Sequence, residues 1–528
     1  MSFDTKGRLR AWAIVLLATG LLVIAVTHDD YGISWDESVQ ARYGELVLDY
    51  FLSGFQDHRA NEYTDTRTYG PLFELAAASL YRPFPERKWE IRHLLSALAA
   101  LGTALALLRI GTLAGGLSVG FFAPLCLIML PRFYGHAFIN SKDVPFACLV
   151  AWSIYALLRL AEGERGWRQI LGCGMAFAGA LALRPGGLPL LLFLYLAIVA
   201  YAGLSRGGWL AWLRPTAAVW GIAWLGMVAL WPWAHQNPLL HPLRAIRVAL
   251  SFPAAYSVLF EGARVWSDEL PRHYALELLL ITTPPAVLVL AVLGLAIIVR
   301  VQLQDPSSAL SLAGFAIEAW LFAPIALVTL FRSNVYDGIR HLLFVLPALA
   351  LFAGIGAGAI LQTIGRSGPR RIVAAALVIV FLAPLTSLVA LHPYQMAYFN
   401  GFVGGVAGAQ GRYETDYWVT SYREAIEWIN ERAAAEPTRE IRVLVAANHH
   451  SRRCAEHYLS PGVRLDATTS DVRSGGIPPE FDYYVATTRF GFDRNFPESP
   501  IVHEVGRGGA IFTVIRERAG DPAPARGP

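Results

Sequence analysis

Residues 341–363 read HLLFVLPALALFAGIGAGAILQT, an apolar run that contains no Asp, Glu, Lys or Arg. A helix needs about 20 such residues to cross a hydrocarbon core of about 30 Å. The length and composition of this run therefore predict a transmembrane helix. Similar runs recur along the chain, so this kind of segment decides the fold class.

The apolar runs are separated by short polar connections, and we expect about eleven transmembrane helices. They cover about 11–27, 91–112, 114–131, 143–161, 169–183, 187–204, 215–234, 275–300, 310–331, 341–363 and 372–391. We expect the first of them to be a retained helix and not a cleaved signal peptide, because it is long and others follow.

The composition agrees with a polytopic membrane protein. The 528 residues are 55% hydrophobic and 16% charged, whereas soluble domains carry about 25% charged residues. The net charge of +4 gives no reason to expect nucleic-acid binding. Three of the four cysteines lie in apolar segments, so no disulfide framework is available.

Basic residues in the short loops give the orientation. With the N-terminus in the cytoplasm, every inner connection carries at least one Arg, as at Arg109, Arg159, Arg214 and Arg300. The outer side then receives most other ionisable residues. Its segments are about 28–90, 131–143, 184–187, 235–274, 333–341 and everything from 392 onward.

The C-terminal part has a different composition from the rest of the chain. It is polar, with strand-like runs at 442–445 and 481–485 and an amphipathic helical pattern at 421–435. This alternation predicts a small α/β domain. We therefore expect a membrane domain at 1–391 and an extracytoplasmic domain at 392–528, whose last residues from Asp521 have a disordered composition.

The first outer loop opens with Ser34-Trp35-Asp36-Glu37. Two adjacent carboxylates at a membrane mouth suit a general base or a metal ligand. The alternative is a helix N-terminus, which Ser34 could cap and whose first turn favours acidic residues.

Two further outer connections carry charges next to a membrane helix. Lys142-Asp143 precedes Pro145 at the start of an apolar run, where Asp143 could also be a plain helix cap. Arg184-Pro185-Gly186-Gly187 interrupts an apolar stretch. An arginine at this depth normally has a partner, such as a lipid phosphate, or extends toward the interface.

Polar and aromatic residues also gather beside the last two predicted helices. Tyr336-Asp337-Gly338-Ile339-Arg340-His341 precedes one, and His392-Pro393-Tyr394 follows the other. The latter, with the 413–418 run, suits carbohydrate stacking or docking of the C-terminal domain. Within the predicted spans, Glu277 and Glu318 could be functional or simply neutral and hydrogen-bonded.

The order of these motifs resembles the GT-C superfamily of membrane glycosyltransferases, over roughly the first 420 residues. The nearest group is the bacterial branch of protein O-mannosyltransferases and aminoarabinose transferase. The motifs are short: 35–37, 142–145, 336–341, 392–400 and 413–418. Arg272 departs from the pattern, because relatives often carry Trp there.

The resemblance implies transfer of a sugar from a polyprenyl-phosphate donor to a glycolipid, polysaccharide or protein, on the outer face of a bacterial inner membrane. It implies Asp36 as the catalytic base, with Glu37 and Asp143 as further acidic candidates. A divalent metal, if one is used, would bind Asp36 or Asp143.

Other roles follow from the type of side chain. Three outer cations could bind the donor phosphate, namely Lys142, Arg184 and Arg340. Four residues are candidate substrate contacts: Tyr336, Asp337, His341 and Tyr394. The main alternative function is a transporter or flippase of a lipid-linked saccharide, which predicts polar residues along a path through the membrane. A sensor or assembly protein is a second alternative.

Overall fold

The computed structural model describes residues 3–250, 255–367, 370–446, 449–468 and 480–518. The chain divides into two compact units. The helical unit comprises residues 1–29, 40–258 and 264–389, and the C-terminal unit comprises 30–39, 259–263 and 390–528. The start of the predicted first outer loop thus groups with the C-terminal residues. Asp521–Pro528, predicted to be disordered, lie outside the described residues.

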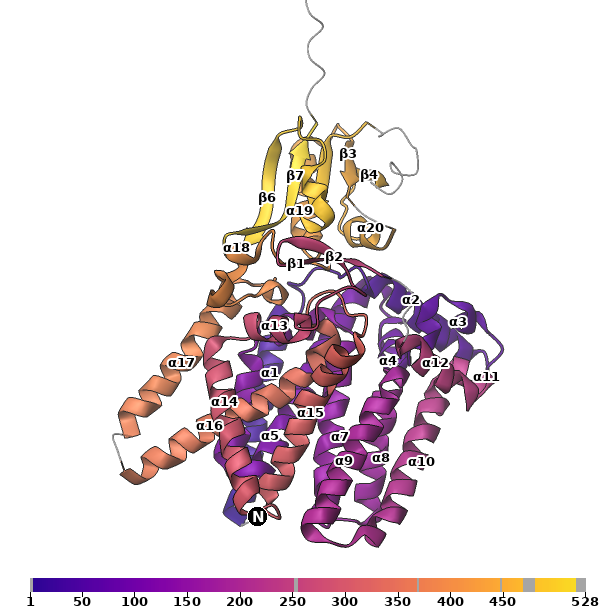
Figure 1. Ribbon diagram of the computed structural model, residues 1–528. Coiled ribbons are helices and arrows are strands. Elements are labelled where there is room, and N and C mark those ends of the chain that lie inside the picture. The colour runs from indigo at the N-terminus through magenta and orange to yellow at the C-terminus, as the bar shows by residue number, and fades with distance from the viewer. Residues whose placement is uncertain (1–2, 251–254, 368–369, 447–448, 469–479, 519–528) are drawn as a thin grey trace, which may run out of the picture. The chain divides into compact units, whose positions relative to one another are not determined.

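The helical unit is built from long apolar helices that run side by side, with shorter helices between them (Figure 1). Its helices are α1 Phe3–Thr27, α2 Glu37–Leu52, α3 Arg59–Glu62, α4 Leu72–Tyr81, α5 Lys88–Ile128, α6 Pro131–Ile139, α7 Asp143–Ala161, α8 Trp167–Leu181, α9 Leu188–Arg206, α10 Leu213–Leu230, α11 Pro232–Gln236, α12 Leu240–Leu250, α13 Tyr274–Ile281, α14 Pro285–Gln304, α15 Ala309–Phe331, α16 Leu346–Ser367 and α17 Arg370–Ala390. Strands β1 Ser257–Phe260 and β2 Ala263–Trp266 form a separate two-stranded sheet.

Helix α5 contains two legs that fold back on each other. The backbone leaves helical geometry at Gly115 and Gly116, where Gly116 has a φ of 79°. A Cβ on Gly120 would lie 2.2 Å from Oγ1 of Thr112, and one on Gly111 would lie 2.9 Å from the carbonyl oxygen of Val119. Residues eight apart in a straight helix are separated by about 12 Å. The predicted segments 91–112 and 114–131 are therefore these two legs.

In the described residues, eight helical stretches are long and apolar enough to cross a membrane. All eleven predicted apolar segments lie on helices, but the structure does not confirm eleven crossings. Helix α5 counts once among the eight, and α8 has only 15 residues. The predicted segment 275–300 is broken, because Pro284 and Pro285 end α13 and begin α14. Glu277 therefore lies on the short α13, outside the spanning stretch that begins at Pro285.

Helix α16 lies at the centre of the helical unit, where it packs against α5 and α14. Glycines permit its close approach to α14. A Cβ on Gly294 would stand 1.9 Å from the Phe352 carbonyl oxygen, and one on Gly356 would stand 2.1 Å from that of Leu290. Small residues allow helix backbones to touch in this way in membrane proteins. The close contact fixes α16, and with it the polar turn at its N-terminal end.

The C-terminal unit contains a five-stranded mixed sheet in the order β4-β3-β5-β7-β6. The strands are β3 Ile441–Val445, β4 Val463–Thr468, β5 Tyr483–Thr487, β6 Ile501–Arg507 and β7 Ala510–Glu517, and the helices are α18 Gly405–Ala409, α19 Tyr422–Ala435 and α20 His449–Glu456. Strand β3 pairs parallel with β4 and β5, whereas β7 pairs antiparallel with β5 and β6. The predicted helix at 421–435 and the strand at 442–445 are confirmed, and the predicted α/β character is correct.

Candidate active site

Three elements of the helical unit bring charged residues together. Asp143 is the first residue of α7, and Arg184 directly precedes the short helix η3, Pro185–Gly187. Arg340 begins η5, Arg340–Val345, which packs against α7. These and their neighbours form what we call the Asp143 cluster: Arg132, His136, Asn140, Asp143, Arg184, Asp337, Arg340 and His341.

Asp143 is buried at the centre of this cluster. Its carboxylate forms an ion pair with Arg184 and accepts a hydrogen bond of 2.9 Å from the side-chain amide of Asn140. The Asn140 side-chain oxygen in turn accepts from the backbone N–H of Asp143, at 2.9 Å. The Asn140 side chain thus occupies the helix N-terminus, which leaves the Asp143 carboxylate free to hold a cation. The plain helix-cap alternative does not describe Asp143.

The second arginine of the cluster is held from the loop before α16. The guanidinium of Arg340 lies 3.1 Å from the carboxylate of Asp337, and both side chains are buried. Arg340 also lies over the ring of Tyr336, 4.8 Å from its centroid. The predicted residues Tyr336, Asp337, Arg340 and His341 therefore lie together, and the charge of Arg340 acts on Asp143.

Sequence reasoning missed three members of the cluster, Arg132, His136 and Asn140. Arg132 and His136 belong to α6 and are buried, although the sequence placed them in a loop. Burial lowers the pKa of His136 to about 3, against which the charge of Asp143 acts. His136 is therefore neutral at physiological pH. The dense polar run at 131–143, between two apolar segments, is the sequence signal that could have indicated these residues.

The cluster carries an excess of positive charge. Its described members include three arginines, Arg132, Arg184 and Arg340, against two carboxylates, Asp143 and Asp337. Within the described part of the chain, Nε of Arg184 is buried without a hydrogen-bond partner. A buried N–H without a partner is costly, and guanidinium groups match phosphate geometry. The cluster is therefore suited to an anion.

Lys142 faces a neighbouring pocket and not Asp143. Its ammonium lies 4.8 Å from the centroid of the Tyr69 ring. With the Gln40 amide turned so that its nitrogen faces Ser141, the amide oxygen accepts 2.8 Å from Lys142. The pocket has about 330 Å³ of empty space and is lined by Gln40, Tyr43, Thr66, Tyr69, Gly70, Phe73, Glu74, Ser141, Lys142 and Leu183.

A buried ion pair supports this pocket. Arg92 pairs with Glu74, and a second guanidinium nitrogen of Arg92 lies 3.2 Å from the hydroxyl of Ser141. Sequence reasoning did not single out either charged residue, and Arg92 stood at the edge of the predicted span 91–112. The pair fixes α4 against α5 and so fixes one wall of the pocket.

The remaining acidic candidates belong to the C-terminal unit. The carboxylate of Glu37 is buried and accepts hydrogen bonds from the backbone N–H and the hydroxyl of Ser34, at 2.8 and 3.1 Å. This is the return half of a helix capping box, so the helix-start alternative describes Glu37. Asp36 is half-buried beside it. Neither Asp36 nor Asp143 belongs to a described group of three or more His, Cys, Asp or Glu side chains close enough to share a metal ion.

Tyr394 is also part of the C-terminal unit. Its hydroxyl donates a hydrogen bond of 2.9 Å to Glu424, which pairs with Arg507 at 2.9 Å. Burial and the charge of Glu424 raise the pKa of Tyr394 well above its usual value. These contacts give Tyr394 a structural role in the C-terminal unit, and its predicted contact with substrate stays a prediction.

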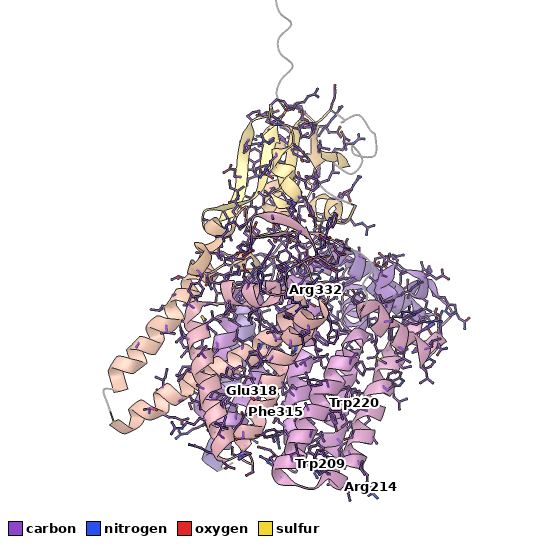
Figure 2. The ribbon with its side chains drawn as sticks, in the orientation of Figure 1. Trp209, Arg214, Trp220, Phe315, Glu318 and Arg332 are labelled. Atoms are coloured by element: carbon purple, nitrogen blue, oxygen red, sulfur yellow. The ribbon has the colours of Figure 1, made fainter. Side chains whose placement is uncertain are left out.

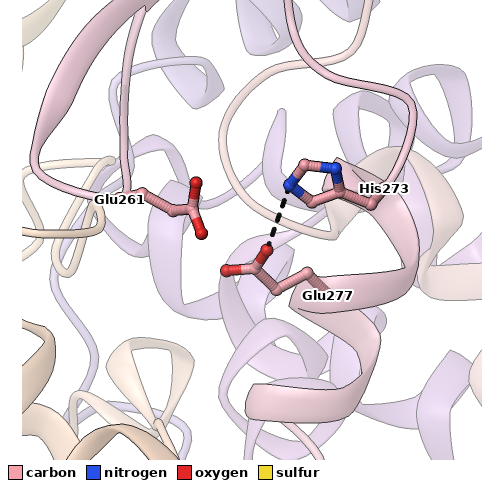
Figure 3. Close-up of side chains that lie close together, drawn as sticks. All are labelled: Glu261, His273 and Glu277. Atoms are coloured by element: carbon pink, nitrogen blue, oxygen red, sulfur yellow. Dashed lines mark ion pairs between the residues drawn. The ribbon is translucent and has the colours of Figure 1, made fainter.

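Two glutamates in predicted spans have local partners. Glu277 lies 3.5 Å from His273, one turn earlier on the start of α13 (Figure 3). Glu318 lies beside Phe315 on α15, away from Arg332 at the end of that helix (Figure 2). It accepts a hydrogen bond of 2.9 Å from Gln302 of α14. The hydrogen-bonded alternative therefore describes Glu318.

Two solved structures have a fold similar to that of this chain. ArnT from Cupriavidus metallidurans, solved with undecaprenyl phosphate, superposes with a TM-score of 0.51 and 15% identity, covering 96% of this chain and 98% of that one. The chain has an ArnT-like fold. The archaeal oligosaccharyltransferase AglB from Archaeoglobus fulgidus, in complex with an inhibitory peptide and a dolichol-phosphate, gives a TM-score of 0.51 and 11% identity, covering 92% of this chain and 70% of that one.

Sequence comparison agrees over part of the helical unit. Residues 69–235 match the model of the dolichyl-phosphate-mannose-protein mannosyltransferase family. No curated protein matches the chain. The matched range includes Lys142, Asp143 and Arg184 and ends before Arg340. The resemblance to GT-C membrane glycosyltransferases is confirmed.

Proposed function

We propose that this protein is a membrane glycosyltransferase that uses a sugar donor carried on a polyprenyl phosphate. The observation that carries the proposal is the Asp143 cluster. Its three arginines exceed its two carboxylates, and Arg184 has an unused N–H. ArnT and AglB, which have the same fold, were solved with lipid phosphates. A phosphate would supply the negative charge that the cluster lacks.

In the proposed reaction, the oxygen of an acceptor hydroxyl attacks the anomeric carbon of the donor. The bond from that carbon to the phosphate oxygen breaks, and polyprenyl phosphate leaves with the electron pair. Arg184 and Arg340 stabilise the charge on the leaving phosphate, as fixed cations do in transferases. Lys142 is a third cation for the donor, in the neighbouring pocket. A single displacement inverts the anomeric centre.

The acceptor proton goes to a carboxylate, and we assign this role to Asp36. Glu37 is committed to Ser34, and Asp143 is committed to Arg184. The resemblance implies Asp36, which is half-buried next to Glu37 in the C-terminal unit. Asp143 then acts as a positioning residue, because it fixes the orientation of the Arg184 guanidinium.

We place the protein in a bacterial inner membrane with the C-terminal unit on the outer side. The arginines in the short inner connections, such as Arg159 and Arg214, support this orientation, because they follow the positive-inside rule. The acceptor is a glycolipid, a polysaccharide or a protein on that side.

Mass spectrometry of envelope glycolipids and glycoproteins from a deletion strain tests the proposal. A sugar modification that disappears on deletion and returns with the wild-type gene supports a transferase. If the deletion strain has no change in the modification of its acceptors and accumulates a lipid-linked saccharide on the inner face, the protein is a flippase and the proposal is wrong.

A further inference from the structure

The segment 30–39 is folded into the C-terminal unit, although about 350 residues separate the two in sequence. The backbone N–H of Ile33 donates to the hydroxyl of Tyr458 at 3.0 Å, and that of Trp35 donates to the carbonyl of Trp418 at 3.3 Å. The hydroxyl of Tyr31 donates to Gln395 at 3.1 Å. Asp36 follows directly on these anchored residues.

The segment lies at the edge of the sheet where α/β domains bind ligands. Strand β3 has β4 on one side and β5 on the other, so the chain reverses its direction of winding between β3 and β5. Ligands bind beyond the carboxyl ends of parallel strands at such a point. Tyr422 marks it, because its hydroxyl donates to Ala446 after β3 and accepts from the backbone N–H of Thr487 at the end of β5.

Arg489 follows β5 at this point and contacts the segment directly. Its guanidinium lies 4.4 Å from the centroid of the Trp35 ring. The same side chain pairs with Glu414 at 3.4 Å and donates to the carbonyl oxygen of Tyr417. Arg489 and Glu414 are both almost completely buried. A desolvated guanidinium is attracted electrostatically to the face of an indole ring, so Arg489 holds Trp35 in place.

A strained turn presses against the same segment. Val419 has a φ of 54°, which is unfavourable for a β-branched residue. Asp416 holds this turn with hydrogen bonds to Thr420 and Ser421, four in all and 2.6 to 3.1 Å long. A Cβ on Gly32 would lie 2.1 Å from the Thr420 carbonyl oxygen. Strain that the surroundings maintain clusters at functional sites.

We propose that the carboxyl edge of the C-terminal sheet is the site that positions Trp35 and Asp36 for catalysis, with Arg489 as the positioning residue. The C-terminal unit then uses its ligand-binding edge to hold a segment of its own chain. This inference rests on the proposed function for the role of Asp36. The anchoring of Trp35 by Arg489 is independent of that role.

Hydrogen exchange on the purified full-length protein tests the anchoring. In Arg489→Ala, we expect the amides of residues 31–37 to exchange at least about 10-fold faster, since Ile33 and Trp35 lose a rigid support. The amides of β5 and β7 should keep wild-type protection. Arg489→Lys should fall in between, because lysine keeps a charge for Glu414 but lacks the planar stack on Trp35. The matched control is Arg494→Ala, an exposed arginine of the same short helix, η8 Arg489–Arg494.

Transfer kinetics test the catalytic consequence. Arg489→Ala should lower kcat at least about 10-fold and leave the KM for the lipid donor within about 2-fold, because the donor phosphate residues lie in the helical unit. Unchanged exchange at 31–37, or faster exchange across the whole sheet, would overturn the proposal. Faster exchange at 31–37 alone, together with a normal kcat in Arg489→Ala, would also overturn this proposal. That result would not contradict glycosyl transfer itself. A different result would refute the proposed function alone. In that case Arg489→Ala shows the expected faster exchange at 31–37, but the wild-type protein transfers no sugar.

Discussion

Replacing Arg184 with alanine should weaken donor binding without unfolding the protein. The guanidinium is partly exposed, pairs with Asp143 and has an unused Nε. A hydrogen bond to a charged group contributes about 1.5–3 kcal/mol. Because each 1.4 kcal/mol changes an equilibrium constant tenfold, the Kd for polyprenyl phosphate should rise about 10- to 150-fold. Arg184→Lys should lose less, because it keeps the charge but not the fork of donors.

The measurement is a titration of the detergent-purified protein with undecaprenyl phosphate, followed by the rise in Tm on binding. Arg214→Ala is the matched control. Arg214 is exposed and follows α9, whose 19 residues span about 28 Å from the end nearest Arg184. Figure 2 shows Arg214 near Trp209, away from Arg332. The reasoning fails if Arg184→Ala binds within about 3-fold of wild type while its Tm without ligand is unchanged.

Four other outcomes follow from the structure. Asp36→Asn should keep the wild-type Tm and abolish transfer in a single-turnover assay, and normal turnover would refute the base assignment. Arg92→Ala should lower the free energy of unfolding by about 3–5 kcal/mol in denaturant titrations, because it strands the buried carboxylate of Glu74; a change below about 1 kcal/mol would contradict the buried pair. The pKa of His136 is about 3 in the folded protein and 6.5 in the unfolded chain, so its contribution to stability is complete above pH 6.5 and is lost as pH falls toward 3. In thermal melts, the Tm of the wild type should therefore fall more over this pH range than the Tm of His136→Gln. An equal fall in Tm for the two proteins would argue against a buried, neutral His136. If Arg184 and Arg340 alone neutralise the leaving phosphate, as proposed, transfer should survive excess EDTA; loss of activity that Mg²⁺ or Mn²⁺ restores would show a metal requirement.

The sequence predicts the helices well because the requirement for crossing a bilayer is local. A run such as 341–363 must satisfy its backbone hydrogen bonds internally wherever it packs. Part of the Asp143 cluster could also be predicted from the sequence, since Asp143, Arg184 and Arg340 each stand at the end of an apolar run. The ends of neighbouring membrane helices lie at the same level of a bundle, so polar residues at those ends come together.

Features that depend on contacts between residues far apart in the sequence could not be predicted. Arg132 and His136 form part of a buried helix because neighbouring elements cover it, and nothing in the local pattern requires this. The division of the acidic candidates between two units is another case. Tyr31 reaches Gln395 across 364 positions, and such a contact leaves no periodicity in the sequence. Distinguishing Asp36 from Glu37 likewise required the bond between Glu37 and Ser34.

The glycine contact between α14 and α16 has a consequence for the energetics of the site. Helix α16 follows η5 without interruption, so Arg340 stands at the end of a helix that is packed closely against α14, at Gly356 of α16 and at Gly294 of α14. A cation fixed in this way is preorganised: it pays no reorganisation energy as charge builds on a departing phosphate. Gly356 lies 16 residues after Arg340 in the sequence. Gly356→Ala should therefore displace α16 and slow the chemical step, because the charge of Arg340 would be misplaced.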